Sequence, residues 1–483
     1  MKNNKKEIEK AINAHLNAKY EEAEELYKKI IKTDNLNLIA INNLASIYNL
    51  KKNFKKSITL LNHVLNIKPD YLDALKNLAI AQKGAELFGE AISNFQKILT
   101  FQKNDPNIYN NLGNCYREMR NFNLAIINYE IALKINPDFS KCIYNKGVCL
   151  QEIGLINEAE ILFKKSAKLA PNLIEPIFSI AHLQLLNENY KDGWKNYEFR
   201  KQKYKNNYPY INFNKELLLV KNFKDIKNKV VFISKEQGYG DYIQFSRYLI
   251  KIKQIGAKII LDTPRSLINI IKTLDIDFIH KDNLDKDDFD YHISILSLPY
   301  FFNTTKNNIP NKIPYLYVPK NEKLYWEKKI KINNKKKIGL MWTGNPKNEN
   351  DKKRSLSLDQ LKSILKLPFE FHSLQIDYKK TDEILFKEFS NLNCHKSEII
   401  GFDKTAGLID SLDLVISVDT SVAHLSGALG KNVWILLPYM PDFRWLLNTN
   451  KNQWYPTATI YRQSKIDDWS TVVKSIREDL LKL

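Results

Sequence analysis

The sequence has few cysteines, few arginines and no long apolar run. Its four cysteines form no CxxC pair, so we expect no cysteine-rich metal site and a reducing compartment. No stretch approaches the ~18 consecutive apolar residues that cross a bilayer, and no apolar segment follows the basic N-terminus. We therefore expect a cytoplasmic protein with no signal peptide and no transmembrane segment. Apolar residues make up 44% of the 483 residues, which is enough for buried cores.

The positive charge comes almost entirely from lysine. The formal net charge is +20, but only nine of the 74 basic residues are arginine, and the lysines are spread along the chain. A nucleic-acid-binding surface concentrates its cations in one patch or stripe, so we expect no nucleic-acid partner. Arginine offers a planar fork that binds carboxylates and phosphates bidentately, so each of the few arginines marks a place where that geometry is useful.

The first 170 residues repeat with a period of 34. A small residue recurs at this spacing, a leucine or aromatic residue follows four positions later, and proline ends three of the units. The small residues are Ala23, Ser57, Ala91, Ala125 and Ala159. These features indicate the tetratricopeptide helix-turn-helix repeat. We predict repeats over 4–37, 38–71, 72–105, 106–139 and 140–173, and a degenerate sixth unit from 174 to about 207 that caps the solenoid.

Asparagine occupies the sixth position of four consecutive repeats, as Asn43, Asn77, Asn111 and Asn145. This position lies on the first helix of each pair, which lines the concave face. An amide donates and accepts at once, so a ladder of amides can hold an extended peptide backbone without reading its sequence. The alternative is that asparagine belongs to the packing pattern of such repeats. The groove is therefore a candidate peptide-binding site.

After residue 207 the pattern changes to alternating strands and helices. We predict strands over 230–234, 257–262, 290–296, 338–342, 371–375, 412–418 and 433–437. We predict helices over 242–254, 266–274, 358–365, 381–389, 404–411, 421–429 and 467–481, the last folding back on the first half. Such alternation implies parallel sheets. A lysine-rich link at 324–337 separates two Rossmann-like halves, over 208–330 and 331–483, which leave a cleft where ligands bind.

The first chemical motif is KEQGYGDYIQFSRYL, over 235–249. Gly238 and Gly240 permit a tight turn with close backbone approach, but no third glycine follows at the spacing of a dinucleotide fingerprint. Asp241 opens the next helix. An aspartate there is explained either as a helix N-cap or as a general base facing the cleft, and the spacing does not choose between them.

Two further motifs offer positive charge or free backbone N–H groups. The loop WTGNPKNENDKKRSL (342–356) carries Lys353 and Arg354, and is either a solvated loop or a clamp on a diphosphate. The stretch VDTSVAHLSGALGK (418–431) begins a helix after a strand, which favours an anion at its N-terminus. Its candidate binding residues are Asp419, Thr420, Ser421 and His424.

Other polar residues near the cleft give weaker signals. Asp442 and Arg444 follow the next strand and are possible substrate contacts, as are Gly238 and Gly240. The triplet Asp275-Ile-Asp277 lies in an ordinary helix-to-strand connection, so we expect no metal site there.

Three stretches together resemble a known family: EQGYGDYIQFSRYL, GLMWTGNPKNENDKKRSLSL and DLVISVDTSVAHLSGALGKNVWILLP. They resemble glycosyltransferase family nine, the group of the ADP-heptose:lipopolysaccharide heptosyltransferases. The layout of a tetratricopeptide solenoid before this region is also similar to O-linked N-acetylglucosamine transferase. The resemblance implies an α-solenoid followed by a GT-B fold, and an inverting, metal-independent transfer from a nucleotide sugar to a protein acceptor. It implies no cofactor other than the nucleotide sugar.

The resemblance also implies roles for single residues. Gly240-Asp241 matches the motif that supplies the family's base. The family's Asp-Thr-Gly-x-x-His motif, which holds the donor, reads Asp419-Thr420-Ser421-Val422-Ala423-His424, with serine in place of glycine. Arg354 or Lys353 corresponds to the cation on the donor phosphates. The alternative function is a non-catalytic tetratricopeptide scaffold whose transferase domain has degenerated.

Overall fold

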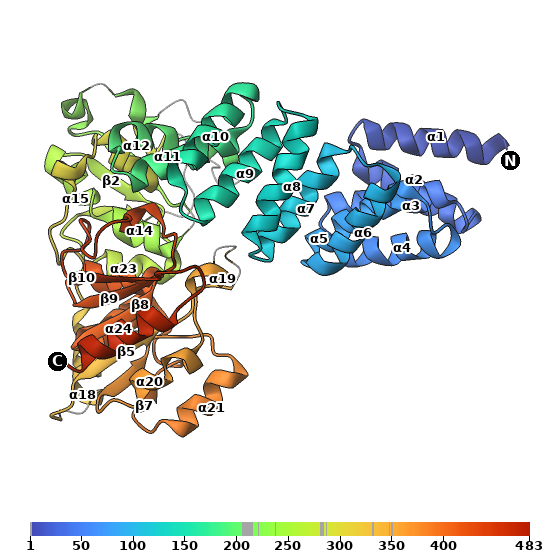
Figure 1. Ribbon diagram of the computed structural model, residues 1–483. Helices are drawn as coiled ribbons and strands as arrows, with labels where there is room; N and C mark the ends of the chain where they lie inside the picture. Colours follow the sequence, from blue (N-terminus) through green and yellow to red (C-terminus); the bar gives the residue numbers. More distant parts are fainter. Residues whose placement is uncertain are drawn as a thin grey trace. The chain divides into compact units, whose positions relative to one another are not determined.

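The computed structural model describes residues 2–204, 216–220, 222–236, 238–280, 285, 287–330, 333–346, 348 and 351–483. The chain divides into two compact units, Met1–Asn172 and Leu173–Leu483. The first is all-helical and the second is α/β (Figure 1). The helical pair that we expected as the cap of the solenoid belongs to the second unit.

The first unit consists of antiparallel helix pairs, as the 34-residue period predicts. Its helices are α1 (Lys2–Leu16), α2 (Tyr20–Thr33), α3 (Leu38–Leu50), α4 (Phe54–Ile67), α5 (Leu72–Gly84), α6 (Phe88–Phe101), α7 (Pro106–Glu118), α8 (Phe122–Ile135), α9 (Ser140–Glu152) and α10 (Ile156–Leu169). The small residues let the helices of a pair approach closely. At Gly113, an added Cβ would lie 2.5 Å from the Tyr129 ring, and at Gly147 it would lie 2.7 Å from the Phe163 ring. The periodic small and aromatic residues therefore form the core between helices.

The second unit begins with helices α11 (Ile174–Leu186), α12 (Tyr190–Tyr197) and α13 (Arg200–Lys203). These helices pack on the α/β part through aromatic rings. The Trp194 ring meets Phe245 at 6.0 Å, Phe443 at 5.8 Å and Trp454 at 6.4 Å between centroids. The Trp194 side chain is 2% exposed. The sixth helical pair is therefore part of the core of this unit.

The first sheet has four parallel strands in the order β3-β2-β1-β4. Its strands are β1 (Val230–Ser234), β2 (Lys258–Leu261), β3 (Phe278–His280) and β4 (Tyr291–Ser294). Helices α14 (Tyr239–Ser246), α15 (Leu249–Ile255) and α16 (Ile268–Ile271) connect them. Strand β1 is central and buried, and it leads directly into α14.

The second sheet has six parallel strands in the order β10-β9-β8-β5-β6-β7. Its strands are β5 (Lys337–Met341), β6 (Glu370–Ser373), β7 (Leu392–Cys394), β8 (Leu414–Val418), β9 (Val433–Leu437) and β10 (Ala458–Arg462). The helices of this half are α19 (Asp351–Arg354), α20 (Lys362–Leu365), α21 (Lys380–Glu388), α22 (Phe402–Asp410), α23 (Ser421–Ala428) and α24 (Ser470–Leu480). All five residues of β8 are buried.

The predicted strands β1 and β9 have the predicted bounds, and five others differ at one or both ends. Three short strands, β3, β7 and β10, were not predicted. Each is an outer strand of its sheet, and none is buried along its whole length. The predicted helix 242–254 is interrupted between α14 and α15.

One expectation about the second half is corrected. The last helix, α24, does not fold back on the first half, since Val472, Val473, Ile476 and Leu480 lie in the core of the six-stranded sheet's own domain with Leu361. The lysine-rich link contains a helix, α18 (Lys320–Lys329), whose Trp326 is fully buried. Gly407 of α22 admits this ring, because a Cβ there would lie 2.4 Å from Trp326 Cδ1.

Candidate functional site

Loops that follow four parallel strands carry the candidate residues of the second unit. β1 leads to Asp241 on α14, β5 to Arg354 on α19, β8 to Asp419, and β9 to Asp442 and Arg444. Ligands of open α/β sheets bind beyond the carboxyl ends of the strands. The candidates therefore come from the edge of each sheet at which a ligand is expected.

Arg444 connects the two halves at this edge. It is 6% exposed, and its Nη2 donates to Asp241 Oδ1 at 2.5 Å while its Nη1 donates to Asp442 Oδ1 at 2.7 Å. Its Nε donates to Gln244 Oε1 at 2.9 Å. Asn452 Nδ2 donates to the Arg444 carbonyl at 2.7 Å and holds the backbone of this loop. Two possible substrate contacts, Asp442 and Arg444, thus form one network with the candidate base, which lies 203 residues away from Arg444.

The position of Asp241 does not fit a helix N-cap. The N-cap residue of α14 is Gly238, and Asp241 is the third residue of the helix. Gly238 has φ +96°, and a Cβ there would lie 2.4 Å from Asp241 Oδ2. Glycine is therefore required twice over, by its backbone conformation and by the carboxylate above it.

The pKa of the Asp241 carboxyl is raised. Burial is the main cause and lifts the pKa to about 6, while the Arg444 guanidinium acts in the opposite direction. The carboxylates of Asp442, Glu236 and Asp419 raise this pKa further. For Asp442, burial also raises the pKa, but its pairing with Arg444 outweighs burial and the pKa is lowered. Asp241 therefore changes its charge nearer to neutral pH than Asp442, the other carboxylate that pairs with Arg444.

Helices α14 and α23 meet where Gly240 faces His424. A Cβ on Gly240 would lie 2.7 Å from His424 Cδ2, so only glycine allows this approach. His424 Nδ1 lies 3.0 Å from the Tyr455 hydroxyl, and its Nε2 lies 3.9 Å from Asp419 Oδ1. Burial is the main reason that the pKa of His424 falls to about 3. The imidazole is thus neutral, and it is oriented by a phenol on one nitrogen and a carboxylate near the other.

The N-terminus of α23 has no side-chain cap among the described residues. Thr420 is at the N-cap position, but its hydroxyl lies 3.1 Å from Ser417 Oγ and bonds no N–H of the helix. Ser421 is the first helical residue. The first N–H groups of a helix need a partner from outside the helix, and the helix dipole favours an anion there.

Arg354 supplies positive charge to this region. Its Nε lies 3.4 Å from Asp351 Oδ1, and its charge acts to lower the pKa values of Asp419 and His424. Burial is the larger effect on the Asp419 carboxyl and raises its pKa. Lys353 precedes Arg354 on α19 and is half-buried. The charge of Arg354, one of the two predicted cations, thus acts on the α23 motif.

Sequence reasoning missed several residues of the site. Gln244, one turn after Asp241, is fully buried and accepts a hydrogen bond from Arg444. The Trp445 ring lies 5.2 Å from the His424 ring, and Tyr455 bonds the imidazole. The sequence signal for Gln244 was its i,i+3 spacing from Asp241, which places both on one face of a helix.

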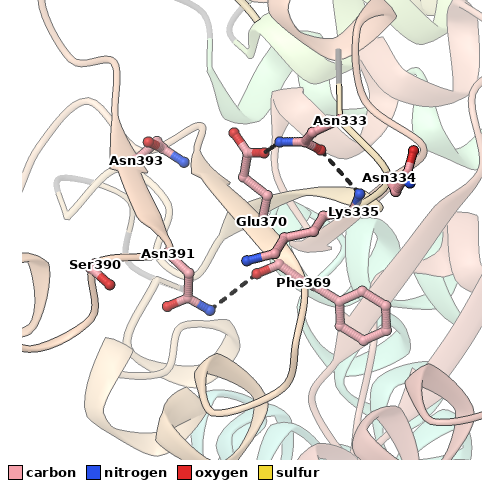
Figure 2. A pocket seen from close by; sticks show the side chains of 8 residues that line it. All are labelled: Asn333, Asn334, Lys335, Phe369, Glu370, Ser390, Asn391 and Asn393. Carbon is pink, nitrogen blue, oxygen red and sulfur yellow. Dashed lines mark hydrogen bonds between the residues drawn. The ribbon is translucent and has the colours of Figure 1, made fainter. Parts of the chain in front are cut away.

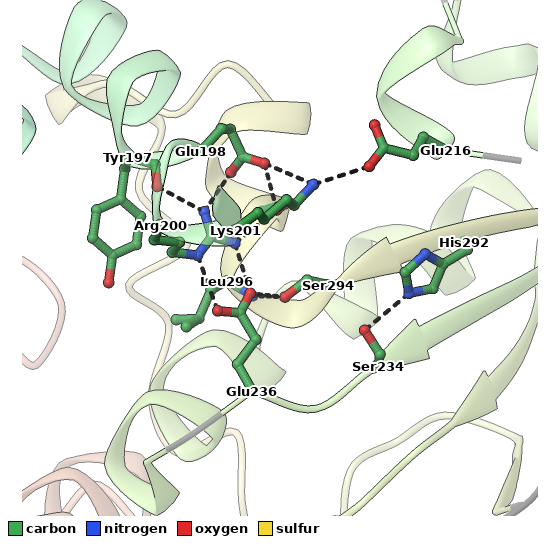
Figure 3. A network of polar contacts seen from close by, with 11 residues as sticks. Tyr197, Glu198, Arg200, Lys201, Glu216, Ser234, Glu236, His292, Ser294 and Leu296 are labelled. Atoms are coloured by element: carbon green, nitrogen blue, oxygen red, sulfur yellow. Dashed lines mark hydrogen bonds and ion pairs between the residues drawn. The ribbon is translucent and has the colours of Figure 1, made fainter. Parts of the chain in front are cut away.

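The sixth helical pair is bound to the first sheet by a charged network centred on Arg200, which is 2% exposed (Figure 3). Arg200 forms a bidentate pair with Glu236, at 3.0 Å and 2.6 Å, and also contacts Glu198 at 2.6 Å. Glu236 accepts a hydrogen bond from Ser294, the last residue of β4. Because Glu236 lies five residues before Asp241, the network fixes the start of the candidate loop.

A pocket of about 600 Å³ lies elsewhere, at the amino ends of β5, β6 and β7 (Figure 2). It is lined by Asn333, Asn334, Lys335, Phe369, Glu370, Ser390, Asn391 and Asn393. Asn391 Nδ2 donates to the Phe369 carbonyl at 3.1 Å, and this hydrogen bond joins the residue before β7 to the residue before β6. None of the predicted site residues lines this pocket.

In the first unit, the asparagine ladder is hydrogen-bonded within the solenoid. Asn77 Nδ2 donates to Asn42 Oδ1 at 2.9 Å, and Asn145 Nδ2 donates to Asn110 Oδ1 at the same distance. Asn43 Nδ2 donates to the Tyr27 hydroxyl at 3.2 Å. In the remaining rung, Asn111 Oδ1 accepts from Lys83 Nζ at 2.6 Å. The ladder therefore joins neighbouring repeats.

No group of three or more His, Cys, Asp or Glu side chains within the described ranges could hold a metal ion. Among the described helices, none combines the length and apolar character needed to span a bilayer.

Comparison with known proteins identifies the first unit. Family models of the tetratricopeptide repeat match residues 39–71, 106–139 and 140–173. Three of the predicted repeats are thus confirmed, with bounds that agree to within one residue. The first unit is a tetratricopeptide-repeat solenoid, which makes it a protein-interaction module. No curated protein matches the chain.

Several solved structures are also similar to this chain, two of them described as tetratricopeptide-repeat proteins. A protein from Thermus thermophilus is 15% identical, covers 38% of this chain and 99% of its own, and has a TM-score of 0.33. A protein from Parabacteroides merdae is 16% identical, covers 42% and 80%, and has a TM-score of 0.36. MamA from Desulfovibrio magneticus is 15% identical, covers 35% and 96%, and has a TM-score of 0.33.

Proposed function

We propose that the protein is a glycosyltransferase that moves a sugar from a nucleotide-sugar donor to a protein acceptor bound by its repeats. The supporting observation is the Asp241 carboxylate, which Arg444 holds beyond the carboxyl end of β1 while Gly240, the preceding residue, packs against His424 of α23. This pairs a candidate base with a candidate anion site. The two parallel sheets agree with the resemblance to glycosyltransferase family nine.

Asp241 would act as the general base. Its pKa of about 6 lies near neutral pH, where a base combines an ionised population with useful basicity. Arg444 occupies Oδ1, which leaves Oδ2 to accept the proton of the acceptor hydroxyl. The acceptor oxygen then attacks the anomeric carbon as the bond to the diphosphate breaks. A single displacement of this kind inverts the configuration at that carbon.

The leaving diphosphate would be stabilised without a metal ion. The uncapped N-terminus of α23 presents N–H groups, and Arg354 adds a full positive charge nearby. His424 is neutral and would contact the donor phosphate or sugar through Nε2. Ser421 replaces the glycine of the related motif, so donor selection is expected to differ from that for ADP-heptose.

The test is the release of nucleotide from a panel of nucleotide sugars with and without peptide acceptors, in the presence of a metal chelator. Asp241→Asn should lower kcat by roughly 10²–10⁴-fold, the usual contribution of a general base. The control is Asp262→Asn, because Asp262 also follows a strand of the first sheet but pairs with Lys235 at 2.7 Å. Equal rates in wild type and Asp241→Asn would remove Asp241 as the base.

The pH dependence gives an independent check. Since the pKa of Asp241 is about 6, kcat/KM should be constant above that pH and fall as Asp241 is protonated below it. A donor that shifts the melting temperature without any nucleotide release would favour the non-catalytic scaffold. Asn43→Ala and Asn77→Ala should raise the KM for the peptide and leave the KM for the donor unchanged.

A further inference from the structure

The side-chain amide of Gln244 has only one possible orientation. Arg444 Nε is a hydrogen-bond donor and can accept nothing, and it lies 2.9 Å from Gln244 Oε1. Exchanging the amide oxygen and nitrogen would place two donors against each other. The oxygen therefore faces Arg444, and the NH₂ group faces away from it.

That NH₂ group has no hydrogen-bond acceptor in the part of the chain that the structure describes. Gln244 is 0% exposed, and its Nε2 is buried without a partner. A buried donor left in this state destabilises a fold by about 1–3 kcal/mol. A buried donor without an acceptor beside an ion-pair network therefore needs an explanation. One explanation is that an oxygen atom of a bound ligand accepts this hydrogen bond.

The amide also lies next to the candidate base. Asp241 accepts from Arg444 Nη2 and Gln244 accepts from Nε, and these two nitrogens form one edge of the planar guanidinium. Both residues come from the same face of α14, one turn apart. Asp442 binds the remaining nitrogen, Nη1. A substrate that brings a hydroxyl to Asp241 thus approaches the neighbourhood of Gln244.

We propose that Gln244 Nε2 binds an oxygen of the acceptor substrate beside the hydroxyl that Asp241 deprotonates. The inference rests on the proposed transferase function and adds a specificity residue to it. The ligand group is a carbonyl or hydroxyl oxygen, as on the backbone next to a serine or threonine. A site built to donate to such an oxygen discriminates against acceptors that lack it, because the buried donor is then left unpaired.

The decisive variant is Gln244→Glu. It keeps an oxygen for Arg444 Nε and nearly the same shape, but it replaces the free NH₂ with a second oxygen. We expect the KM for the acceptor to rise at least 10-fold, with the KM for the donor changed less than 2-fold. Gln184→Glu is the matched control, since Gln184 Oε1 also accepts from a side chain, Asn196 Nδ2 at 2.9 Å, away from the network. It should leave both constants unchanged.

A pH profile separates direct binding from an effect through Asp241. An added carboxylate could act by raising the pKa of Asp241, and that loss would be recovered at high pH. A loss of acceptor binding persists at every pH, which is the result expected here. Recovery above pH 8, or a change confined to the donor KM, overturns the inference. If wild type releases no nucleotide from any donor, the proposed function itself fails, whereas an active wild type with unchanged Gln244→Glu constants rejects this inference alone.

Discussion

The two units differ in the chemistry of what they bury. The solenoid buries only uncharged polar side chains among those described: Asn42, Ser57, Gln82, Asn110, Asn145 and Ser166. The α/β unit buries three arginines, Arg200, Arg247 and Arg444, together with four histidines and three aspartates. Burying a charge is expensive unless it is paired, so buried charges concentrate where a fold needs a specific polar geometry.

The two units therefore position their polar side chains in different ways. The solenoid repeats one uncharged core, and the asparagines of its ladder form hydrogen bonds between neighbouring repeats. The α/β unit instead fixes a few charged side chains in one arrangement, and their pKa values are shifted by burial, as is common at functional sites. We therefore expect the second unit to respond strongly to pH and to single charge changes, and the first to respond mainly to changes of volume.

Acid gives the largest expected contrast between the units. Burial lowers the pKa of His182, His292, His372 and His395 to about 4, and that of His424 to about 3, all below the ordinary value of 6.5. The unfolded chain therefore binds these protons first, and stability is present above pH 6.5 and lost as pH falls toward 4. Each histidine contributes roughly 2 kcal/mol of this loss by pH 5.

Tryptophan fluorescence can follow this loss, because all seven tryptophans lie in the second unit. The emission should shift to the red between pH 6.5 and 4 while much of the helical circular dichroism remains. Asp241 acts in the opposite direction, since its raised pKa adds stability as pH falls through 6. The raised pKa of Asp419 acts in the same direction as that of Asp241, against five histidines whose pKa values are lowered. Loss of the solenoid's helical signal before any fluorescence change would contradict the comparison.

A buried arginine should matter far more in the second unit than a surface arginine in the first. Arg247 donates to the carbonyls of Pro310 and Trp454, at 3.0 Å and 2.7 Å, and to the Tyr315 hydroxyl. Arg247→Ala should lower the free energy of unfolding by about 3–5 kcal/mol, because several buried acceptors lose their donor. Arg120, with a side chain 29% exposed, pairs with Glu152 at 3.3 Å, and Arg120→Ala should remove about 1 kcal/mol or less. Urea unfolding measured by fluorescence and by circular dichroism gives both values.

A small increase in side-chain volume at a packing glycine should destabilise the solenoid. In Gly147→Ala the new Cβ would meet the Phe163 ring at 2.7 Å, which should destabilise the first unit by about 1–3 kcal/mol. The circular dichroism transition should move to lower urea, while the fluorescence transition of the second unit stays in place. An equal shift of both transitions would show that the two units do not unfold separately.

The smallest expected effect has the opposite sign. Gly89 of α6 has no atom within 4 Å of an added Cβ, so alanine fits there without displacement. Gly89→Ala should stabilise the first unit by about 0.4–1 kcal/mol, because alanine loses less conformational freedom on folding. Comparison of Gly89→Ala with Gly147→Ala in the same circular dichroism assay distinguishes a glycine that close packing requires from one that alanine can replace.

Patterns local in sequence were predictable. The 34-residue period gave the helix pairs, and apolar runs gave β1 and β9 with their bounds. The tight turn at Gly238 and the close approach at Gly240 could be predicted as well. What could not be predicted was pairing over long distances. The sequence around Asp241 does not indicate that Arg444 is its partner. Gln244 resembles any other polar residue of a helix, and only the structure shows that its side chain accepts a hydrogen bond from the Arg444 guanidinium. The three unpredicted strands lack the apolar runs on which strand prediction depends.

The bond between Asp241 and Arg444 has a consequence for how the protein folds. It closes a loop of 203 residues, which makes it one of the least local contacts in the second unit. Contacts of high sequence separation form late, because the entropy of loop closure must be overcome first. During refolding, helices and both sheets can therefore regain their spectroscopic signals before the carboxylate meets the guanidinium. Recovery of the proposed transferase activity would then report the docking of the two halves, and it should lag behind the recovery of secondary structure.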